Sequence, residues 1–426
     1  MPDTPLSTAA TVLDLARSGR FAELRELFPP PLRDMVSADS LQAAWDTEIV
    51  RTGPVVEIGT PLVESDAHGT LVKIPITCER GGLTAIIQAS ESGALLGIQL
   101  APLAATEPGQ EWQPPSYAVL DAFDEQEVTV GDGPLAVGGT LSLPRIPGQH
   151  PGIVLLAGSG PQDRDETIGR NKILKDLAWG LASRGVAVLR FDKVTYAHGR
   201  EIATRDFTLV DEYVPHALSA VELLRDHHAV DAGRIFLAGH SLGGTVAPRV
   251  AASEPIIAGI VLLAGGVAPL HWSAVRQATY LASLDPNLAA TYQPMIETFT
   301  RQAIAIDKLD ASSNTPASEL PFGTPASYWL DLRGYDPVAT AASLGKPMLI
   351  LQGGRDYQVT VADELSRWRD GLAASPDVTI RIYDADDHMF FPGSGPSTPA
   401  KYEPAQHMDR EVITDIANWL TASQRG

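Results

Sequence analysis

The chain has 426 residues, which is too long for one ordinary compact domain and predicts about two to three units. Apolar residues make up 44% of it and charged residues 20%, as in an ordinary soluble globular protein. Its 52 acidic residues against 32 basic ones give a net charge of −20. That field would repel nucleic acid and anionic membrane surfaces, so we expect neither as a partner.

Three further features bear on the compartment. No apolar run approaches the roughly 18 residues of a membrane span. Residues 1–20 lack the basic start and apolar block of a signal peptide. The single cysteine, Cys78, excludes an intrachain disulfide and fits a reducing compartment. We therefore expect a cytoplasmic protein, with Cys78 as a small buried apolar residue.

The N-terminal part of the chain, residues 1–102, predicts a small α+β domain. Apolar residues at three- and four-residue intervals predict helices within 7–51. Short β-rich runs follow, separated by turns: VVEIGTPLV, LVKIPITCE, LTAIIQAS and ALLGIQL. Residues 103–118 are rich in proline and polar residues and are typical of a linker. No residue of 1–102 signals chemistry, so three roles stay open: shaping a pocket rim, forming a homodimer, or packing against the rest.

Residues 119–426 alternate strand and helix patterns, which predicts an α/β fold. Near-continuous apolar runs, typical of strands buried on both faces, lie at 152–158, 186–192, 234–239, 259–265 and 347–353. Helical stretches between most of them imply right-handed crossovers and a parallel sheet covered on both sides. The EVTVG run and Gly138–Leu141 before them predict an antiparallel hairpin at one edge.

The interval between Gly265 and Pro347 departs from that alternation. A structureless loop of this length would be unusual in a compact domain. Helical pieces such as SAVRQATYLASL predict instead a helical insertion at about 268–335. It follows the carboxyl end of a strand, so we expect it to cover the active-site crevice as a lid. Its aromatic residues are candidates for the substrate pocket or, equally, for packing within the lid: Trp272, Tyr280, Tyr292, Phe299, Tyr328 and Trp329.

The pentad Gly239-His240-Ser241-Leu242-Gly243 is the strongest chemical signal in the sequence. It follows a strand pattern and precedes a segment that can be helical, which is the context of a nucleophile elbow. Glycines are needed at both flanks because side chains there would collide in the strained turn. A glycine-rich turn with an incidental serine is the alternative, and the placement between strand and helix disfavours it.

A serine hydroxyl barely ionises at neutral pH, so Ser241 needs a base, and a third group must orient that base. In this fold the order along the chain is nucleophile, acid, histidine. Three histidines follow Ser241, at 271, 388 and 407. His271 falls in the insertion and His407 opens the last helix. His388, directly after the strand pattern VTIRIYD, is therefore the expected base.

Asp356 is the expected orienting acid because it comes just past the strand PMLILQGG. The alternative is a turn aspartate that caps the following helix. Asp386 and Asp387 are rival acids. A neighbour in sequence cannot easily face the far nitrogen of the same imidazole ring, so both rank below Asp356.

An oxyanion hole needs backbone N–H donors aimed at the developing charge. We expect one from Leu242, directly after the nucleophile. The other should come from the loop after GIVLLAG, with Ser159 ahead of Gly160. In the same loop lies the charged run 163–166, which without a nearby histidine or cysteine favours a salt-bridged loop over a metal site. Its expected partners are Arg190 and Lys193, and we expect no metal and no cofactor.

Together the segments GSGPQDRDETIG, RFDK, GHSLGG, LQGGRD and DDHMF resemble bacterial α/β-hydrolase esterases of the dienelactone-hydrolase-like and EstD-like group. The N-terminal unit resembles the small NTF2-like (DUF3887-type) domain that precedes some of them. The likeness is strong over 119–426 and weak over 1–102. It implies carboxylesterase-type acyl transfer, with Ser241, Asp356 and His388 as the triad.

The expected function is thus a serine carboxylesterase that acts on a small-molecule ester. Two alternatives stay open. One is a biosynthetic acyltransferase, thioesterase or cyclase, because fold alone does not separate transfer from hydrolysis. The other is a non-catalytic binding or dimerisation protein, which the full set of elbow, acid, base and oxyanion loop disfavours.

Overall fold

The computed structural model describes residues 4–33, 36–66, 69–79, 81–102, 112–202, 205–310, 312–313 and 315–422. The chain divides into two compact units. Unit 1 comprises Met1–Glu111, His271–Leu330 and Thr398–Pro404. Unit 2 comprises Trp112–Leu270, Asp331–Ser397 and Ala405–Gly426. The helical insertion, expected within 119–426, thus falls largely into the same compact unit as the N-terminal residues.

Unit 2 is built on an eight-stranded sheet in the order β15-β14-β13-β12-β8-β11-β7-β6. Its strands are β6 (Phe123–Val130), β7 (Val137–Pro144), β8 (His150–Leu156), β11 (Ala187–Phe191), β12 (Val230–His240), β13 (Ile257–Leu263), β14 (Met348–Gly353) and β15 (Val378–Tyr383). The six strands from β15 to β11 pair in parallel. The hairpin β6–β7 is antiparallel and lies at the edge, as its pattern predicts. The α/β-hydrolase fold expected from the sequence is confirmed.

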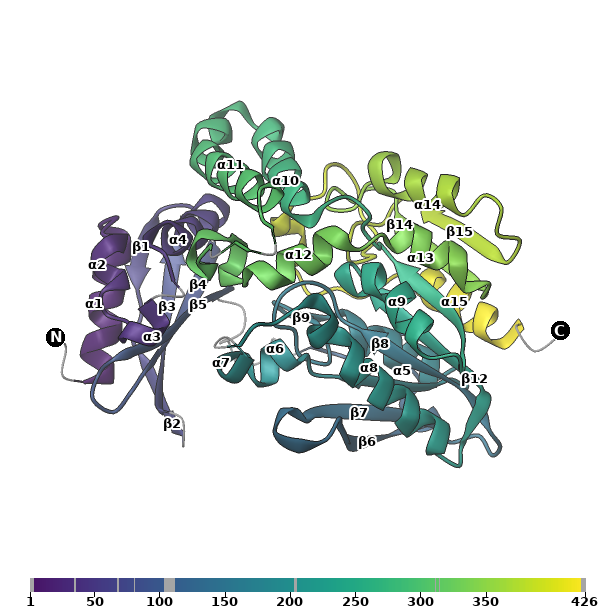
Figure 1. Cartoon of the computed structure of the whole chain (residues 1–426). Coiled ribbons are helices and arrows are strands. Elements are labelled where there is room, and N and C mark those ends of the chain that lie inside the picture. Colours follow the sequence, from purple (N-terminus) through teal and green to yellow (C-terminus); the bar gives the residue numbers. More distant parts are fainter. Residues whose placement is uncertain are drawn as a thin grey trace. The chain divides into compact units, whose positions relative to one another are not determined.

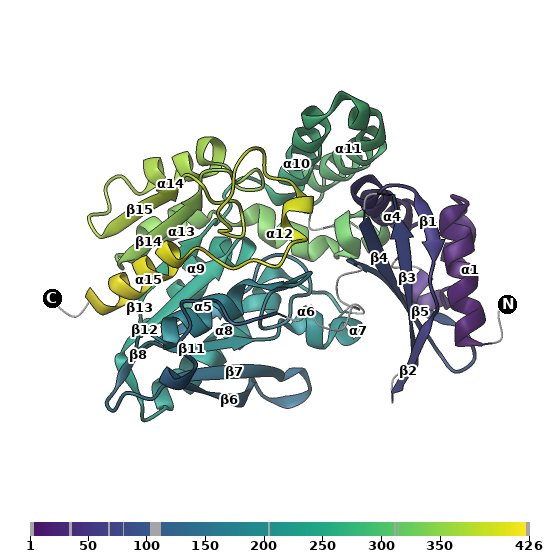
Figure 2. The same cartoon turned by 180° about the vertical axis from the view of Figure 1, so that it is seen from behind.

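Helices cover both faces of this sheet because its central strands are apolar on both sides; β8 and β11 are buried along their whole length. One face carries α8 (Leu209–Asp226), α9 (Leu242–Ser253), α13 (Pro337–Leu344) and α14 (Ser366–Gly371) (Figure 1). The other carries α5 (Ile173–Ala182) and α15 (Arg410–Ala422), which pack on each other (Figure 2).

Shorter elements connect these parts of unit 2. They are η2 (Leu120–Ala122), η3 (Gly133–Leu135), β9 (Thr167–Ile168), β10 (Asn171–Lys172), α6 (Val194–Ala197), α7 (Gly199–Ile202) and the π-helix η6 (Val361–Leu365). The described part of the expected linker, residues 112–118, belongs to unit 2, where Trp112 Nε1 donates to Asp176 at 2.9 Å. The remainder, 103–111, lies outside the described residues.

Unit 1 contains an α+β layer made by the N-terminal residues. Its helices are α1 (Pro5–Arg17), α2 (Phe21–Arg25), α3 (Pro30–Arg33) and α4 (Ala38–Thr52). Thr4 and Ser37 begin α1 and α4 with reciprocal side-chain caps. The antiparallel sheet consists of β1 (Val55–Ile58), β2 (Leu62–Asp66), β3 (Gly69–Cys78), β4 (Gly81–Ala89) and β5 (Leu95–Pro102), with β3 at its centre. The expected α+β character is present, while the NTF2-like resemblance stays a prediction.

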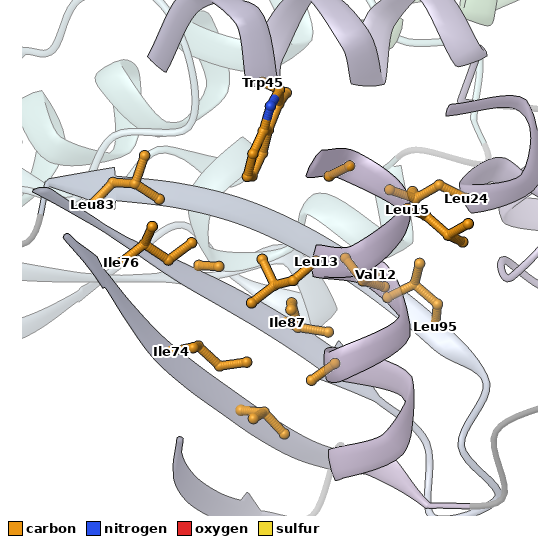
Figure 3. Packing of buried hydrophobic residues seen from close by; sticks show 14 of the residues in the cluster. Val12, Leu13, Leu15, Leu24, Trp45, Ile74, Ile76, Leu83, Ile87 and Leu95 are labelled. Atoms are coloured by element: carbon orange, nitrogen blue, oxygen red, sulfur yellow. The ribbon is translucent and has the colours of Figure 1, made fainter. Parts of the chain in front are cut away.

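The core of this layer lies between the helices and one face of the sheet. Figure 3 shows Trp45 of α4 pointing toward the sheet, with Val12 and Leu13 of α1 packed over Ile87 of β4. Cys78 belongs to this core and is buried, as expected for a small apolar residue.

The insertion adds α10 (Leu270–Leu284), α11 (Pro286–Asp307), η4 (Ala317–Glu319), η5 (Pro321–Gly323) and α12 (Ala326–Gly334); η7 (Pro399–Tyr402) also lies in unit 1. Within unit 1, α11 packs along α4. Asp39 of α4 pairs with Arg301 of α11 at 2.8 Å, and the Thr47 hydroxyl lies 3.4 Å from the Met295 sulfur. Over the described residues, no helix combines the length and apolar character needed to cross a membrane.

Candidate active site

Ser241 occupies a strained turn between β12 and α9, with φ 52° and ψ −118°. A Cβ on Gly239 would collide with the backbone of Gly243. One on Gly243 would collide with the carbonyl of Leu156 and lie 2.7 Å from that of Ala157. The start of α9 therefore presses against the ends of β12 and β8, which only glycine permits at these positions. This is the geometry of a nucleophile elbow.

His388 and Asp356 meet at the neighbouring strand ends. His388 follows β15 and Asp356 follows β14, and His388 Nδ1 lies 2.7 Å from Asp356 Oδ2. Both residues are buried. The second oxygen, Asp356 Oδ1, accepts N–H bonds from Gln358 and Val359 at 2.7 and 2.9 Å. The carboxylate is thus held in place while it orients the imidazole, the arrangement that a triad requires.

Three of the rival groups are engaged elsewhere. Asp387 Oδ1 accepts the backbone N–H groups of Met389 and Phe391, and so shapes the loop that carries His388. The ring of His407 bonds to Asp176, and that of His271 to Asp307 in unit 1. Among these candidates, the imidazole–carboxylate pair at the carboxyl ends of the unit 2 strands is His388–Asp356.

The pentad is tied to the loop that carries His388. His240, the residue before Ser241, has Nε2 3.0 Å from the backbone oxygen of His388, and their rings lie 4.8 Å apart. A carbonyl oxygen only accepts, so Nε2 of His240 carries a proton. This hydrogen bond holds the turn that carries Ser241 against the loop after β15, which carries His388.

The expected oxyanion loop passes beside the serine. A Cβ built on Gly158 would lie 3.3 Å from Ser241 Cβ. Ser159 and Gly160 follow it and are exposed, and Gly160 has a φ of 83° that suits glycine. Leu242 is the first residue of α9, so its N–H is one of the amides without a partner inside the helix.

Glu166, the last residue of the charged run 163–166, is buried and makes a contact with His240 that the sequence did not predict. Its Oε1 lies 3.0 Å from the N–H of Gly158 and 2.8 Å from His240 Nδ1. Burial lowers the pKa of His240, but Glu166, the His388 carbonyl and Asp356 together raise it above its ordinary value. Both ring nitrogens of His240 face acceptors, an arrangement that favours the protonated ring. The hydrogen-bonded series Gly158–Glu166–His240–His388 thus links the loop after β8 to the loop after β15.

A second buried group holds Gly158 at its carbonyl oxygen. The Lys193 ammonium donates to the Gly158 carbonyl at 2.9 Å and pairs with Glu212 at 3.0 Å. Burial lowers the pKa of Lys193, and Glu212 opposes that shift. Tyr213 donates to the Gly158 carbonyl as well, at 2.9 Å. The N–H and the carbonyl of Gly158 are therefore both held by charged or hydroxyl side chains.

The run 163–166 is a salt-bridged loop, as its composition predicts. Asp165 pairs with Arg190 at 2.8 Å and with Lys172 at 2.9 Å. Lys193, the other expected partner, pairs with Glu212 instead. Over the described residues, no group of three or more His, Cys, Asp or Glu side chains is arranged to hold a metal ion.

Comparison with known proteins places this arrangement in a family. The family model described as serine aminopeptidase, S33, matches residues 168–392. The sequence is 33% identical over 389 residues to esterase EstD of Thermotoga maritima, an alignment that covers 91% of this chain and 89% of that protein. The chain belongs to the EstD-like α/β-hydrolase family.

Two further matches are weaker. Protein phosphatase methylesterase 1 of Candida albicans is 32% identical over 119 residues, 28% of this chain and 30% of that protein. Among solved structures, a hyperthermophilic esterase from the archaeon Pyrobaculum calidifontis aligns with a TM-score of 0.45 at 18% identity, over 71% of this chain and 87% of that one.

In this EstD-like chain the insertion aromatics pack within unit 1. Trp272 Nε1 donates to Asp307 Oδ2 at 3.0 Å. Trp329 is buried, with its ring centroid 6.0 Å from those of both His271 and Tyr328. Tyr280 lies half-buried on α10. Contact with substrate stays a prediction for Trp272, Tyr280, Tyr328 and Trp329, as does the role of the insertion as a lid.

Proposed function

We propose that this EstD-like protein is a serine carboxylesterase that forms its acyl-enzyme on Ser241. The family supplies ester hydrolysis as the class of reaction. The observation that carries the residue assignment is the buried 2.7 Å contact between His388 Nδ1 and Asp356 Oδ2, beside the strained elbow of Ser241. That contact leaves Nε2 of His388 as the nitrogen that can take a proton from the serine.

In the first half-reaction the Ser241 hydroxyl adds to the ester carbonyl, and its proton passes to His388 Nε2. Asp356 stabilises the imidazolium that forms. When the tetrahedral intermediate collapses, the bond to the alkoxy oxygen breaks and His388 gives the proton to the leaving alcohol. In the second half-reaction water adds to the acyl carbonyl with the same proton transfers, releasing the acid and restoring Ser241.

The oxyanion formed in each half-reaction is assigned to backbone donors. Leu242 N–H is one, and Ser159 N–H, with Gly160 as the alternative, is the other. Such donors are effective because they are already oriented when the charge develops. Gly158 lies directly before Ser159, and its N–H and carbonyl are both held by side chains. These contacts support the assignment because they fix the position of the loop backbone.

A pair of serine substitutions tests the proposal. Ser241→Ala removes the nucleophile and should lower kcat for p-nitrophenyl esters by at least about a thousand-fold. Ser159→Ala keeps its backbone N–H and should leave kcat within about a factor of three. Near-normal turnover by Ser241→Ala would overturn the assignment. A matched p-nitroanilide measured alongside separates esterase from the aminopeptidase activity that the family model's description names, and we expect the ester to be preferred.

A further inference from the structure

Unit 1 contains a cavity of about 770 Å³ that is partly open to solvent. Its walls come from α1, α2 and α4, from β4 and β5, and from α10 and α11. That volume falls in the range of roughly 300–1,000 Å³ typical of small-molecule sites. Protein cores ordinarily leave few voids larger than a water molecule, so a space of this size is not ordinary packing.

The walls of the cavity are mainly apolar. Representative side chains are Val12, Leu13, Trp45, Leu281, Met295 and Phe299. Figure 3 shows three of them, Val12, Leu13 and Trp45, within the core of the N-terminal layer. Tyr292 and Phe299, two of the insertion aromatics that the sequence offered for a pocket, also line this cavity. Apolar walls of this kind favour an aliphatic or otherwise hydrophobic occupant.

The charges around the cavity narrow the class of ligand. Among the described residues that line it, Glu48 carries the single ionisable acid, and none is lysine, arginine or histidine. A carboxylate or phosphate inside would find no cation and would face Glu48. Moving an unpaired anion from water into apolar surroundings is strongly unfavourable. These walls therefore favour an uncharged ligand.

We propose that unit 1 is a binding site for an uncharged, mainly aliphatic small molecule. The site does not depend on the triad, because every lining residue belongs to unit 1 and Ser241, Asp356 and His388 all belong to unit 2. Each methylene that enters the cavity should tighten binding by about four-fold. A neutral ligand should also bind more tightly than the anion of the same chain length.

The test uses the full-length Ser241→Ala protein, so that binding is measured without turnover. Isothermal titration with hexanol, octanol and decanol should show Kd falling by about four-fold per methylene. Decanoate at pH 8, the matched anion, should bind at least about ten-fold more weakly than decanol. A Kd that does not change with chain length, or decanoate binding as tightly as decanol, would overturn the proposal.

Substitutions inside and outside the cavity locate the binding. Ala44 on α4 and Ala274 on α10 both line it, and Ala44→Leu or Ala274→Leu adds bulk to the space. Each should weaken decanol binding by about ten-fold or more. Ala290→Leu on α11 is the control, because this residue is exposed and lies outside the lining.

Two readouts keep this second test decisive. Circular dichroism reports whether each variant is folded, and fluorophosphonate labelling of the same substitutions with Ser241 intact reports on unit 2 separately. Folded Ala44→Leu and Ala274→Leu proteins that bind decanol as tightly as Ala290→Leu would place the ligand elsewhere and refute the cavity as its site. If the protein without cavity substitutions binds decanol but is not labelled at Ser241, that result counts against the proposed function alone.

Discussion

At the scale of single residues, Glu166 is a side chain that fixes the backbone next to Ser241. One carboxylate oxygen serves both the Gly158 N–H and His240 Nδ1. A glutamine oxygen has two lone pairs and could still accept both N–H groups. What glutamine lacks is the negative charge of Glu166, which raises the pKa of His240.

We expect Glu166→Gln to lower kcat about ten-fold with little change in KM, because the hydrogen bonds to Gly158 and His240 lose their charged acceptor and become weaker. Glu127→Gln is the matched control, since Glu127 is an exposed acid paired with Arg164. Steady-state kinetics with a p-nitrophenyl ester measure both. Equal kcat values for the two variants would show that the link from Glu166 to His240 does not contribute to catalysis.

Asp386 should make the stability of the protein depend on pH. It is buried two residues before His388, and among the described residues neither carboxylate oxygen has a hydrogen-bond partner. Burial, with Asp409, Asp387 and Glu411 nearby, raises its pKa from 3.8 to about 7, against the opposing effect of Arg355. The folded state thus holds this proton more tightly than the unfolded state. The resulting stability is complete below pH 3.8 and is lost as the pH rises through about 7.

Asp386→Asn removes the ionisable carboxyl group, and with it the loss of stability as the pH rises. At pH 8.5 the variant should melt ~2–4 °C above the unmodified protein, and at low pH the difference should shrink. Asp384→Asn, a change at an exposed neighbour, should leave the melting temperature unchanged at both pH values. Thermal unfolding at the two pH values checks this, and a larger gain at low pH than at pH 8.5 would contradict the assignment.

The strand ends that carry the proposed triad could be predicted from the sequence, but the side chains that surround it could not. Ser241, Asp356 and His388 each follow a strand pattern, and the fold brings strand ends together. Glu166 and His240 are 74 residues apart and interact only because the loop after β8 folds back over the pentad. Neither periodicity nor local motif encodes such a pair, and Lys193 was assigned the wrong partner for the same reason.

At the scale of elements, the elbow depends on how closely α9 approaches β8 and β12. Gly243→Ala would place a Cβ against the Leu156 carbonyl and should destabilise the protein by about 1–3 kcal/mol. Gly199→Ala is the control, because no atom lies within 4 Å of its added Cβ. Urea unfolding measures both. A midpoint for Gly243→Ala equal to that of the control would mean that the elbow is less tightly packed than described.

The strands of unit 2 could be predicted almost one by one, because strands buried on both faces form continuous apolar runs. VAVLRFD became β11 and PMLILQG became β14, within one residue at each end. The surface against which α10 and α11 pack could not be predicted. A helix pattern identifies its apolar face but not the partner of that face.

At the scale of the whole molecule, the compact units cut across the order of the chain. The N-terminal layer and most of the insertion share unit 1, and both contribute walls to its cavity. A protein that begins at Trp112 would leave Leu281, Met295 and Phe299 without the α4 side of that cavity. We expect it to bind more of an apolar dye such as ANS than the full-length protein. Equal dye binding by the two proteins would show that α10 and α11 do not need the N-terminal layer.

The central claim is that Ser241 is a nucleophile activated by His388 and Asp356. Treatment with a fluorophosphonate, followed by intact-mass and peptide mass spectrometry, tests it most directly. We expect one adduct per chain on the peptide that contains Ser241. Labelling of His388→Ala should be at least about a hundred-fold slower. An unlabelled Ser241 in the folded protein, or labelling as fast in His388→Ala, would contradict it.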